Sequence, residues 1–183
     1  MGGKSTRLSS SVTVAQYLIL EQAGNREALG RFIQERFNER YLRPVEASQE
    51  KHGFTMLAIG CLAIETLESF YQGKANTKGE SEKMFNGFFS RDTPFKVFAG
   101  NNGWFYKNIR CGILHQAETR GGWRVLRTGP LLDASQKTIN AARFCQELRK
   151  AVAYYAKQIE SDDSCWQNFQ KKMRAICDNC SRS

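Results

Sequence analysis

Apolar residues recur at intervals of three and four along most of the chain, and this spacing predicts α-helices. A first clear helix is expected to begin after Asn25, whose side chain can cap it, and to end at Pro44. Residues 12–20 are also apolar, but their pattern fits a short strand as well as a helical turn. The apolar stripe of the first clear helix consists of Leu29, Phe32, Ile33, Phe37 and Tyr41.

The next apolar segment, residues 54–71, is hydrophobic on nearly all sides. A helix with this pattern is typical of the centre of a fold. Glu65 follows directly on the apolar run, and a carboxylate buried there would need a cationic or hydrogen-bonding partner. Glu65 equally suits the point at which the helix emerges into solvent, and the sequence leaves both interpretations open.

Shorter elements are expected in the middle of the chain. The pattern indicates a short helix over residues 80–89, extended chain over residues 95–98 after Pro94, and a helix over residues 104–116. Residues 123–127 alternate with period two, and residues 131–133 can pair back on them, which predicts a β-hairpin at about residues 121–133. Amphipathic helices are expected over residues 139–159 and 161–180.

Together these elements predict an all-α fold, a helical bundle of four to five main helices with a small β-hairpin insertion. Residues 1–12 are small, polar and rich in serine, and are expected to form a flexible N-terminal tail. Residues 13–183 are expected to form a single domain, because this length suits one substantial core.

The net positive charge of the chain favours acidic binding partners. The chain has 27 Lys and Arg against 18 Asp and Glu, a net charge of +9, and a balance of this kind favours nucleic acid. No apolar run approaches the ~20 residues of a membrane span, and the six scattered cysteines look like the free thiols of a reducing compartment. We therefore expect a cytoplasmic protein with no membrane partner, no metal site and no cofactor.

The segment of residues 104–116 carries the strongest candidates for catalytic residues. Its His115 is one of only two histidines, and Arg110 precedes it by five positions. Cys111 is one helical turn before His115 and lies on the same face, whereas Arg110 is about 140° away around the helix axis. Gly112 is expected to leave space beside the imidazole. Arg110 and His115 therefore need a bridging phosphate or a second subunit to form one site, or else they are unrelated core or surface residues.

The chemistry that such a pair suits is cleavage of RNA without a metal ion. A histidine near neutrality can abstract the proton of a 2′-hydroxyl or protonate the leaving oxygen. An arginine can hold the phosphate and stabilise the charge that develops on it. The sequence shows no cluster of carboxylates of the kind that two-metal nucleases use.

The run Arg110-Cys111-Gly112-Ile113-Leu114-His115, late in a helical chain and after an apolar second helix, resembles the HEPN superfamily. The resemblance implies a HEPN-like domain over residues 13–183, and a homodimeric endoribonuclease with Arg110 and His115 as catalytic residues. HEPN ribonucleases recur among bacterial toxins and antiphage defence effectors. The resemblance therefore implies RNA as substrate and an antitoxin or a defence-system protein as a further partner.

One position departs from the pattern of active members, in which the residue after the arginine is commonly Asn, Asp or His. Here it is Cys111, and a thiol is a poor substitute for orienting a histidine. Asn108 and Glu65 are candidate supporting residues, and RNA contacts are assigned to Arg120, Arg124 and Arg127, which also suit a solvated edge strand. The alternative function is a catalytically inactive HEPN-like module that binds nucleic acid or a partner protein.

Overall fold

The computed structural model describes residues 3–47, 50, 52–100 and 103–181, and these form a mostly helical fold with a small three-stranded sheet. The α-helices are α1 (Val14–Gln22), α2 (Arg26–Phe37), α3 (Arg43–Glu46), α4 (Gly53–Tyr71), α5 (Ser81–Phe89), α6 (Cys111–Gln116), α7 (Ala141–Ser161) and α8 (Asp163–Ser181). Further helical elements are the π-helical turns η2 (Asn38–Leu42) and η5 (Tyr106–Arg110), and the 3₁₀-helices η1 (Gly3–Ser5) and η3 (Pro94–Phe98).

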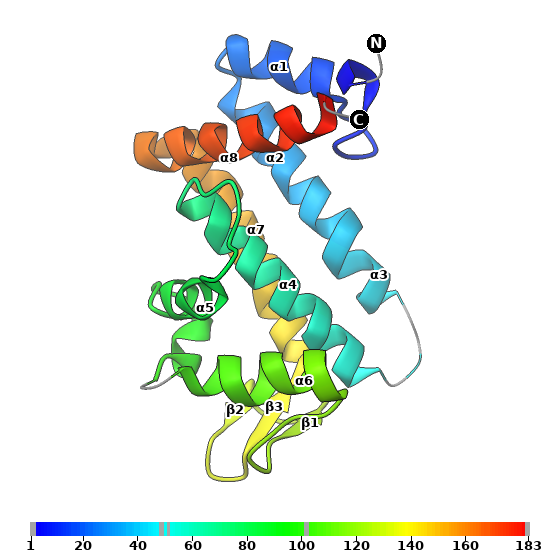
Figure 1. Ribbon diagram of the computed structural model, residues 1–183, viewed down its shortest axis with the longest axis vertical. Helices are drawn as coiled ribbons and strands as arrows, with labels where there is room; N and C mark the ends of the chain where they lie inside the picture. Colours follow the sequence, from blue (N-terminus) through cyan, green and yellow to red (C-terminus); the bar gives the residue numbers. More distant parts are fainter. Residues whose placement is uncertain (1–2, 48–49, 51, 101–102, 182–183) are drawn as a thin grey trace.

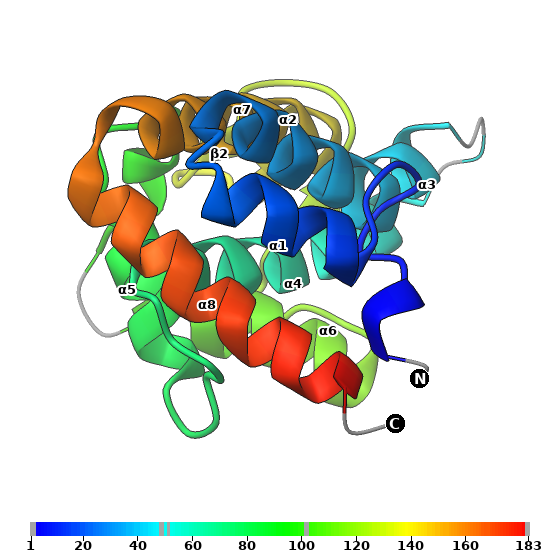
Figure 2. The ribbon, with the colours of Figure 1, turned by 90° about the horizontal axis from the view of Figure 1, so that it is seen from above.

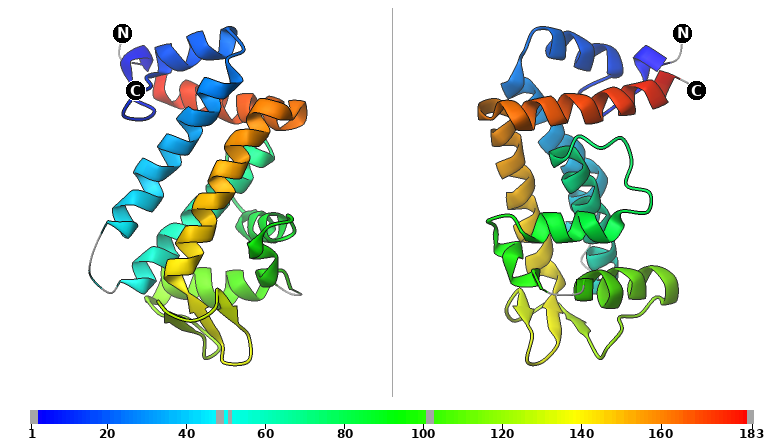
Figure 3. Two further views of the ribbon diagram at one scale, coloured as in Figure 1. Left: turned by 180° about the vertical axis from the view of Figure 1, so that it is seen from behind. Right: turned by 60° about the vertical axis from the view of Figure 1, so that its left-hand side comes forward.

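Helix α4 is the central element, and it packs on α5, α7 and α8 (Figure 1). Helices α2 and α7 lie side by side along the long axis of the molecule, as the left view of Figure 3 shows. Helices α1 and α8 cross one end of this group, where the N-terminus and the C-terminus also lie (Figure 2), and α6 and the sheet close the other end. By length and composition α4 resembles a membrane span, but 56% of its apolar window is buried inside the fold, as expected for a core helix.

The local signals for two of the N-terminal elements are clear in the structure. Asn25 caps α2 by accepting a hydrogen bond from the backbone N–H of Ala28, which confirms the predicted start of this helix. The ambiguous segment of residues 12–20 contains helix α1, because Thr13 and Gln16 form a reciprocal capping box. The predicted end at Pro44 is wrong, since Pro44 lies in the first turn of α3, where the missing N–H is tolerated.

The N-terminal segment that we expected to be a flexible tail is packed against α2 over the residues that the structure describes. Leu8 is buried in the core, and its carbonyl accepts hydrogen bonds from the guanidinium groups of Arg36 and Arg40. The serines that suggested a tail instead donate to Glu35, because Ser9 and Ser10 face this carboxylate from the loop.

Residues 95–98 are not extended, as predicted, but form the 3₁₀-helix η3. With three residues per turn, Phe95 and Phe98 fall on one side of this helix, and both are almost completely buried. Both rings contact Phe144 of α7, with centroids 4.9 Å and 5.6 Å apart. The burial of these aromatic rings therefore determines the local backbone and overrides the extended pattern that Pro94 suggested.

The predicted β-hairpin at residues 121–133 is also wrong in its pairing. Strand β1 (Arg124–Leu126) does not pair with β2 (Leu132–Asp133), because β3 (Thr138–Asn140) lies between them. Strand β1 is parallel to β3, whereas β2 and β3 are antiparallel neighbours. The pattern had placed Ile139 at the start of a helix, but its side chain is fully buried in the middle strand, and α7 begins only after Asn140.

The most deeply buried charge of the fold is Glu68 on α4, which is 1% exposed. Arg91, in the loop after α5, binds it with two hydrogen bonds, from Nε to Oε2 at 2.8 Å and from Nη2 to Oε1 at 3.0 Å. The guanidinium of Arg91 also lies 3.6 Å from the ring centroid of Tyr71. This bidentate pair fixes the chain after α5 onto the central helix.

We expect Arg91→Ala to lower the free energy of unfolding by about 3 kcal/mol, because the substitution leaves the carboxylate of Glu68 buried without its cation. Chemical denaturation followed by circular dichroism measures this change. The matched control is Arg31→Ala, which removes an exposed pair with Glu27 and should cost about 0.5 kcal/mol or less. Equal costs for the two variants would show that the Glu68 pair does not stabilise the fold.

Candidate functional site

The candidate site begins with the π-helical turn η5, which directly precedes α6. The backbone N–H of Cys111 donates to the carbonyl of Tyr106, five residues earlier, so this turn contains one more residue than an α-helical turn. Single π-helical turns often occur at functional sites. Here the turn ends at Arg110 and places its guanidinium 5.4 Å from the ring centroid of Tyr106.

Arg110 faces the central helix and pairs with Glu65. Its Nη2 lies 3.6 Å from Oε2 of Glu65, and the two side chains are only 18% and 15% exposed. The other carboxylate oxygen, Oε1, accepts hydrogen bonds from the hydroxyls of Thr77 at 2.6 Å and Ser81 at 2.8 Å. Of the two interpretations of Glu65 that the sequence left open, the structure has the one with a cationic partner.

The pair between Arg110 and Glu65 is loose. A separation of 3.6 Å is too long for a hydrogen bond, and the guanidinium donates no hydrogen bond to any other group in the described parts of the chain. An arginine has five N–H donors, and a partly buried one normally uses several of them. Arg110 therefore keeps N–H donors with which a guanidinium can bind an anion.

Two cavities adjoin Arg110, and Arg110 and Leu62 line both of them. The smaller cavity, about 110 Å³, is apolar and lies between α4 and α6. The larger one, about 290 Å³, is polar and extends along α4 towards α8. The smaller is lined further by Ala58, Cys61, Ile113 and Leu114, and the larger by Glu65, Thr66, Ser69, Asn76, Thr77 and Lys172.

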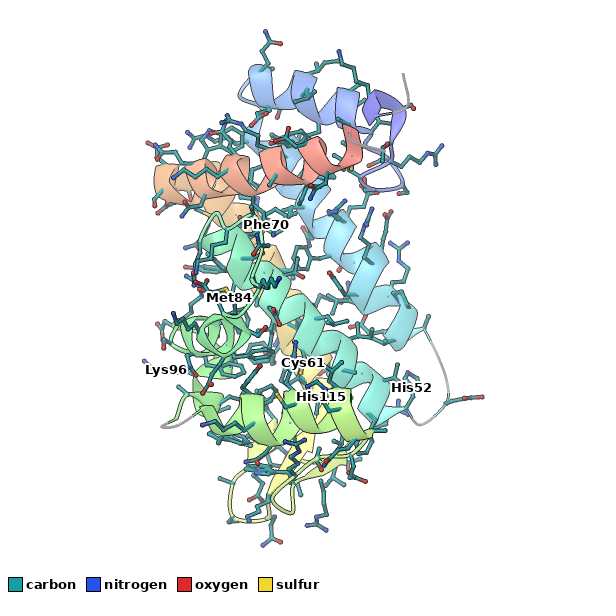
Figure 4. All side chains as sticks on the ribbon, viewed as in Figure 1. His52, Cys61, Phe70, Met84, Lys96 and His115 are labelled. Atoms are coloured by element: carbon teal, nitrogen blue, oxygen red, sulfur yellow. The ribbon has the colours of Figure 1, made fainter. Side chains whose placement is uncertain are left out.

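His115 lies in the last turn of α6 and is exposed. Figure 4 shows His115 on α6, just below Cys61 of α4. No hydrogen bond or ion pair of His115 occurs within residues 3–47, 50, 52–100 and 103–181. Arg110 faces α4 while His115 faces solvent, so the structure does not bring these two predicted catalytic side chains together within one chain.

The predicted supporting residues around the motif have other partners. Burial, and then the side chain of Cys111, raise the pKa of Tyr106, so these two side chains lie close together across the π-helical turn. The side-chain amide of Asn108 lies beside Gly121, and the backbone carbonyl of Asn108 accepts from the backbone N–H of Arg120 at 2.8 Å. Asn108 therefore fixes the loop after α6.

Gly112 has a different role from the one that the sequence suggested. A Cβ atom at this position would lie 2.5 Å from the carbonyl oxygen of Glu118 and 3.2 Å from the Cα of Thr119. The space beside Gly112 is thus filled by the returning backbone. Ala117 ends the helix in the left-handed conformation, at φ 53°, and this turns the chain back along α6.

The three arginines that we assigned to RNA contact are exposed. Arg124 donates to the carbonyl of Gln136, and Arg127 donates to the carbonyl of Glu50. The backbone of Arg120 is tied to Asn108 next to the motif. All three retain N–H donors for a phosphate, because a single hydrogen bond to a carbonyl uses one of five.

Sequence reasoning did not identify four residues around Arg110, namely Tyr106, Thr77, Ser81 and Lys172. Thr77 and Ser81 come from the loop before α5 and its first residue, and a loop gives no periodic signal. Lys172 occupies an ordinary position in the sequence of an amphipathic helix. Only the packing of α8 against α4 shows that its side chain lines the cavity of Arg110.

No protein-family model matches the chain, and neither a curated protein nor a solved structure matches it.

We expect Gly112→Ala to lower the free energy of unfolding by about 1–3 kcal/mol, because the added methyl group collides with the backbone of Glu118. In a helix without this contact the same change would stabilise by up to about 1 kcal/mol. The sign of the change in a denaturation experiment therefore tests the close approach. Gln116→Ala, at an exposed position of the same helix, is the control and should be nearly neutral.

Proposed function

We propose that the chain is a metal-independent endoribonuclease of the HEPN type, a helical bundle of four to five main helices that acts as a homodimer. The observation that carries this proposal is Arg110, which is partly buried between two cavities and has donors without an acceptor. In this function Arg110 holds the scissile phosphate, and its fixed charge stabilises the negative charge that develops at phosphorus.

The reaction is attack of the 2′-oxygen of the RNA on the adjacent phosphorus. The bond from phosphorus to the 5′-oxygen breaks, which leaves a 2′,3′-cyclic phosphate and a 5′-hydroxyl. His115 takes the proton of the 2′-hydroxyl or gives a proton to the leaving 5′-oxygen. Because His115 is exposed and faces away from Arg110, the histidine that acts beside Arg110 belongs to a second subunit.

An exposed apolar surface beside Arg110 supports the homodimer. Leu62 on α4 is 48% exposed and Leu114 on α6 is 58% exposed, and both line the smaller cavity. A second copy seated here would bury these side chains, and its own α6 would bring a second His115 to the site. Exposed arginines at the sheet, Arg120, Arg124 and Arg127, would contact the RNA backbone on either side.

In the cell, such an enzyme would be a cytoplasmic toxin or antiphage effector, restrained by an antitoxin or a defence-system protein. The second candidate function is a catalytically inactive module that binds RNA or a partner protein. One observation favours it: no side chain in the described part of the chain forms a hydrogen bond or ion pair that orients His115. This module would still use Arg110 to bind phosphate.

We expect the purified protein to cleave labelled RNA in the presence of EDTA, and His115→Ala to reduce the rate about 10²–10⁴-fold through loss of proton transfer. Arg110→Ala should reduce it comparably through loss of phosphate binding. His52→Ala is the matched control, since it removes the other histidine, which bonds the carbonyl of Val45 at 2.8 Å. Cleavage that persists in either motif variant would refute the site, and RNA binding without cleavage would establish the inactive module.

We expect Leu114→Glu to convert the homodimer into a monomer and to abolish cleavage, because a carboxylate cannot be buried unpaired in an apolar interface. Analytical ultracentrifugation measures the first effect, and the RNA assay measures the second. Ile19→Glu is the control, since Ile19 on α1 is 67% exposed at the opposite end of the fold and should leave the dimer intact. A wild-type protein that cleaves RNA as a monomer would contradict the proposed interface.

A further inference from the structure

A second cation lines the same cavity as Arg110, on a helix outside the run from Arg110 to His115. Lys172 of α8 is only 9% exposed, and its Nζ donates to the carbonyl of Ala75 at 3.1 Å. Its Nζ is also 5.9 Å from the ring centroid of Phe70. Across the part of the chain that the structure describes, no carboxylate lies within ion-pair distance of Lys172.

A buried lysine without a carboxylate is uncommon, because burial of a charge is costly unless another charge compensates it. The electrostatic surroundings of Lys172 increase this cost. Burial, followed by the like charge of Arg36, lowers the pKa of Lys172. One backbone carbonyl offsets only part of the cost, so the arrangement favours an anion that approaches from the cavity.

Lys172 and Arg110 line the same polar cavity of about 290 Å³. Arg110 lies beside Glu65 at one end, whereas Lys172 lies beside Phe70 and Ala75 at the other. The α4 residues that line the cavity run from position 62 to position 69, and seven steps of helix correspond to ~10 Å. The loop between α4 and α5, which carries Asn76 and Thr77 of the lining, passes below α8 (Figure 3).

The lining between the two cations suits an oxyanion. Asn76 contributes an amide at the exposed rim, and Thr66 contributes a hydroxyl that pairs with the hydroxyl of Tyr41 at 3.1 Å, whereas the hydroxyls of Ser69 and Thr77 already donate to the carbonyl of Thr66 and to Glu65. The one carboxylate, Glu65, is already occupied by Arg110 and by the hydroxyls of Thr77 and Ser81. A cavity with two cations and an exposed amide suits phosphate groups, and cations spaced along it suit more than one.

We propose that this cavity is a second phosphate subsite, in which Lys172 binds a backbone phosphate of the same RNA strand whose scissile phosphate contacts Arg110. The identification of the strand as RNA substrate rests on the proposed function, whereas the binding of phosphate rests on the cavity alone. The subsite makes the enzyme prefer a strand with several phosphates over a single nucleotide.

The test measures binding of a short single-stranded 2′-O-methyl RNA oligonucleotide, which cannot be cleaved because it has no free 2′-hydroxyl. We expect Lys172→Met, which keeps the apolar stem of the side chain, to weaken binding about tenfold, the lower end of what a charge-assisted hydrogen bond contributes. The slope of log K against log salt should fall by about 0.7, because one phosphate contact is lost.

The matched control is Lys171→Met, which removes the same charge from an exposed position of the same helix. This variant should retain the wild-type slope and affinity within about twofold. Lys172→Met should melt at the wild-type temperature or up to about 4 °C above it, since it removes an uncompensated buried charge. Equal slopes for the wild type and Lys172→Met would overturn the subsite.

A second variant does not depend on the folding of Lys172→Met. Asn76→Asp preserves the side-chain oxygen that accepts from the N–H of Lys78 and adds a negative charge at the rim of the cavity. It should weaken oligonucleotide binding as strongly as Lys172→Met, and unchanged binding would count against the subsite. Adenosine 5′-monophosphate is the comparison ligand, and tighter binding of this nucleotide than of the strand would overturn the preference for a strand.

The binding and cleavage experiments together distinguish failure of the subsite from failure of the proposed enzyme. Wild-type protein that binds the oligonucleotide through Lys172 but never cleaves RNA would disprove the enzyme and keep the subsite. Wild-type protein that cleaves RNA, with equal slopes for Lys172→Met and Lys171→Met, would keep the enzyme and disprove the subsite. Wild-type protein that does not bind the oligonucleotide at all would disprove the subsite.

Discussion

The arrangement of this fold depends on two carboxylates that the central helix α4 carries one turn apart, Glu65 and Glu68. Both lie where water is largely excluded, so each needs a cation, and the two cations come from different parts of the chain. Arg91 binds Glu68 from the loop after α5, and Arg110 approaches Glu65 from η5. These two pairs connect the middle of the chain to α4 and determine where the motif helix lies.

The two ion pairs differ in how firmly the arginine is bound to its carboxylate. Arg91 makes two hydrogen bonds of ordinary length to Glu68 and stacks on Tyr71, so its donors are committed. Arg110 stays 3.6 Å from Glu65. Meanwhile Thr77 and Ser81 already satisfy the other oxygen of that carboxylate, so a shift of Arg110 towards a ligand leaves Glu65 partly stabilised. The first pair is therefore suited to stability, and under the proposed function the second would allow Arg110 to exchange a carboxylate for a phosphate.

Much of the fold follows from local rules that the sequence displays. The apolar period predicted α2, α5, α7 and α8, and Asn25 at the N-cap predicted where α2 begins. The errors arise where long-range packing decides, because Phe95, Phe98 and Ile139 are positioned by contacts with α7 and the sheet. The pairing of Glu65 could be expected from its place in an apolar helix. The identity of its partner could not, since η5 adds a residue to a turn and changes the direction of Arg110.

Arg110 lies between two cavities whose linings differ. On one side the lining is apolar, with Leu62 and Leu114 exposed, and such a surface is best covered by protein. On the other side the lining is polar and ends at Lys172, and such a surface is best covered by an anion. One arginine therefore borders both, so that a ligand in the polar cavity and a subunit on the apolar surface would meet at the same guanidinium. Under the proposed function the divergence of His115 from Arg110 within one chain fits this division, because the histidine of each subunit would serve the arginine of the other.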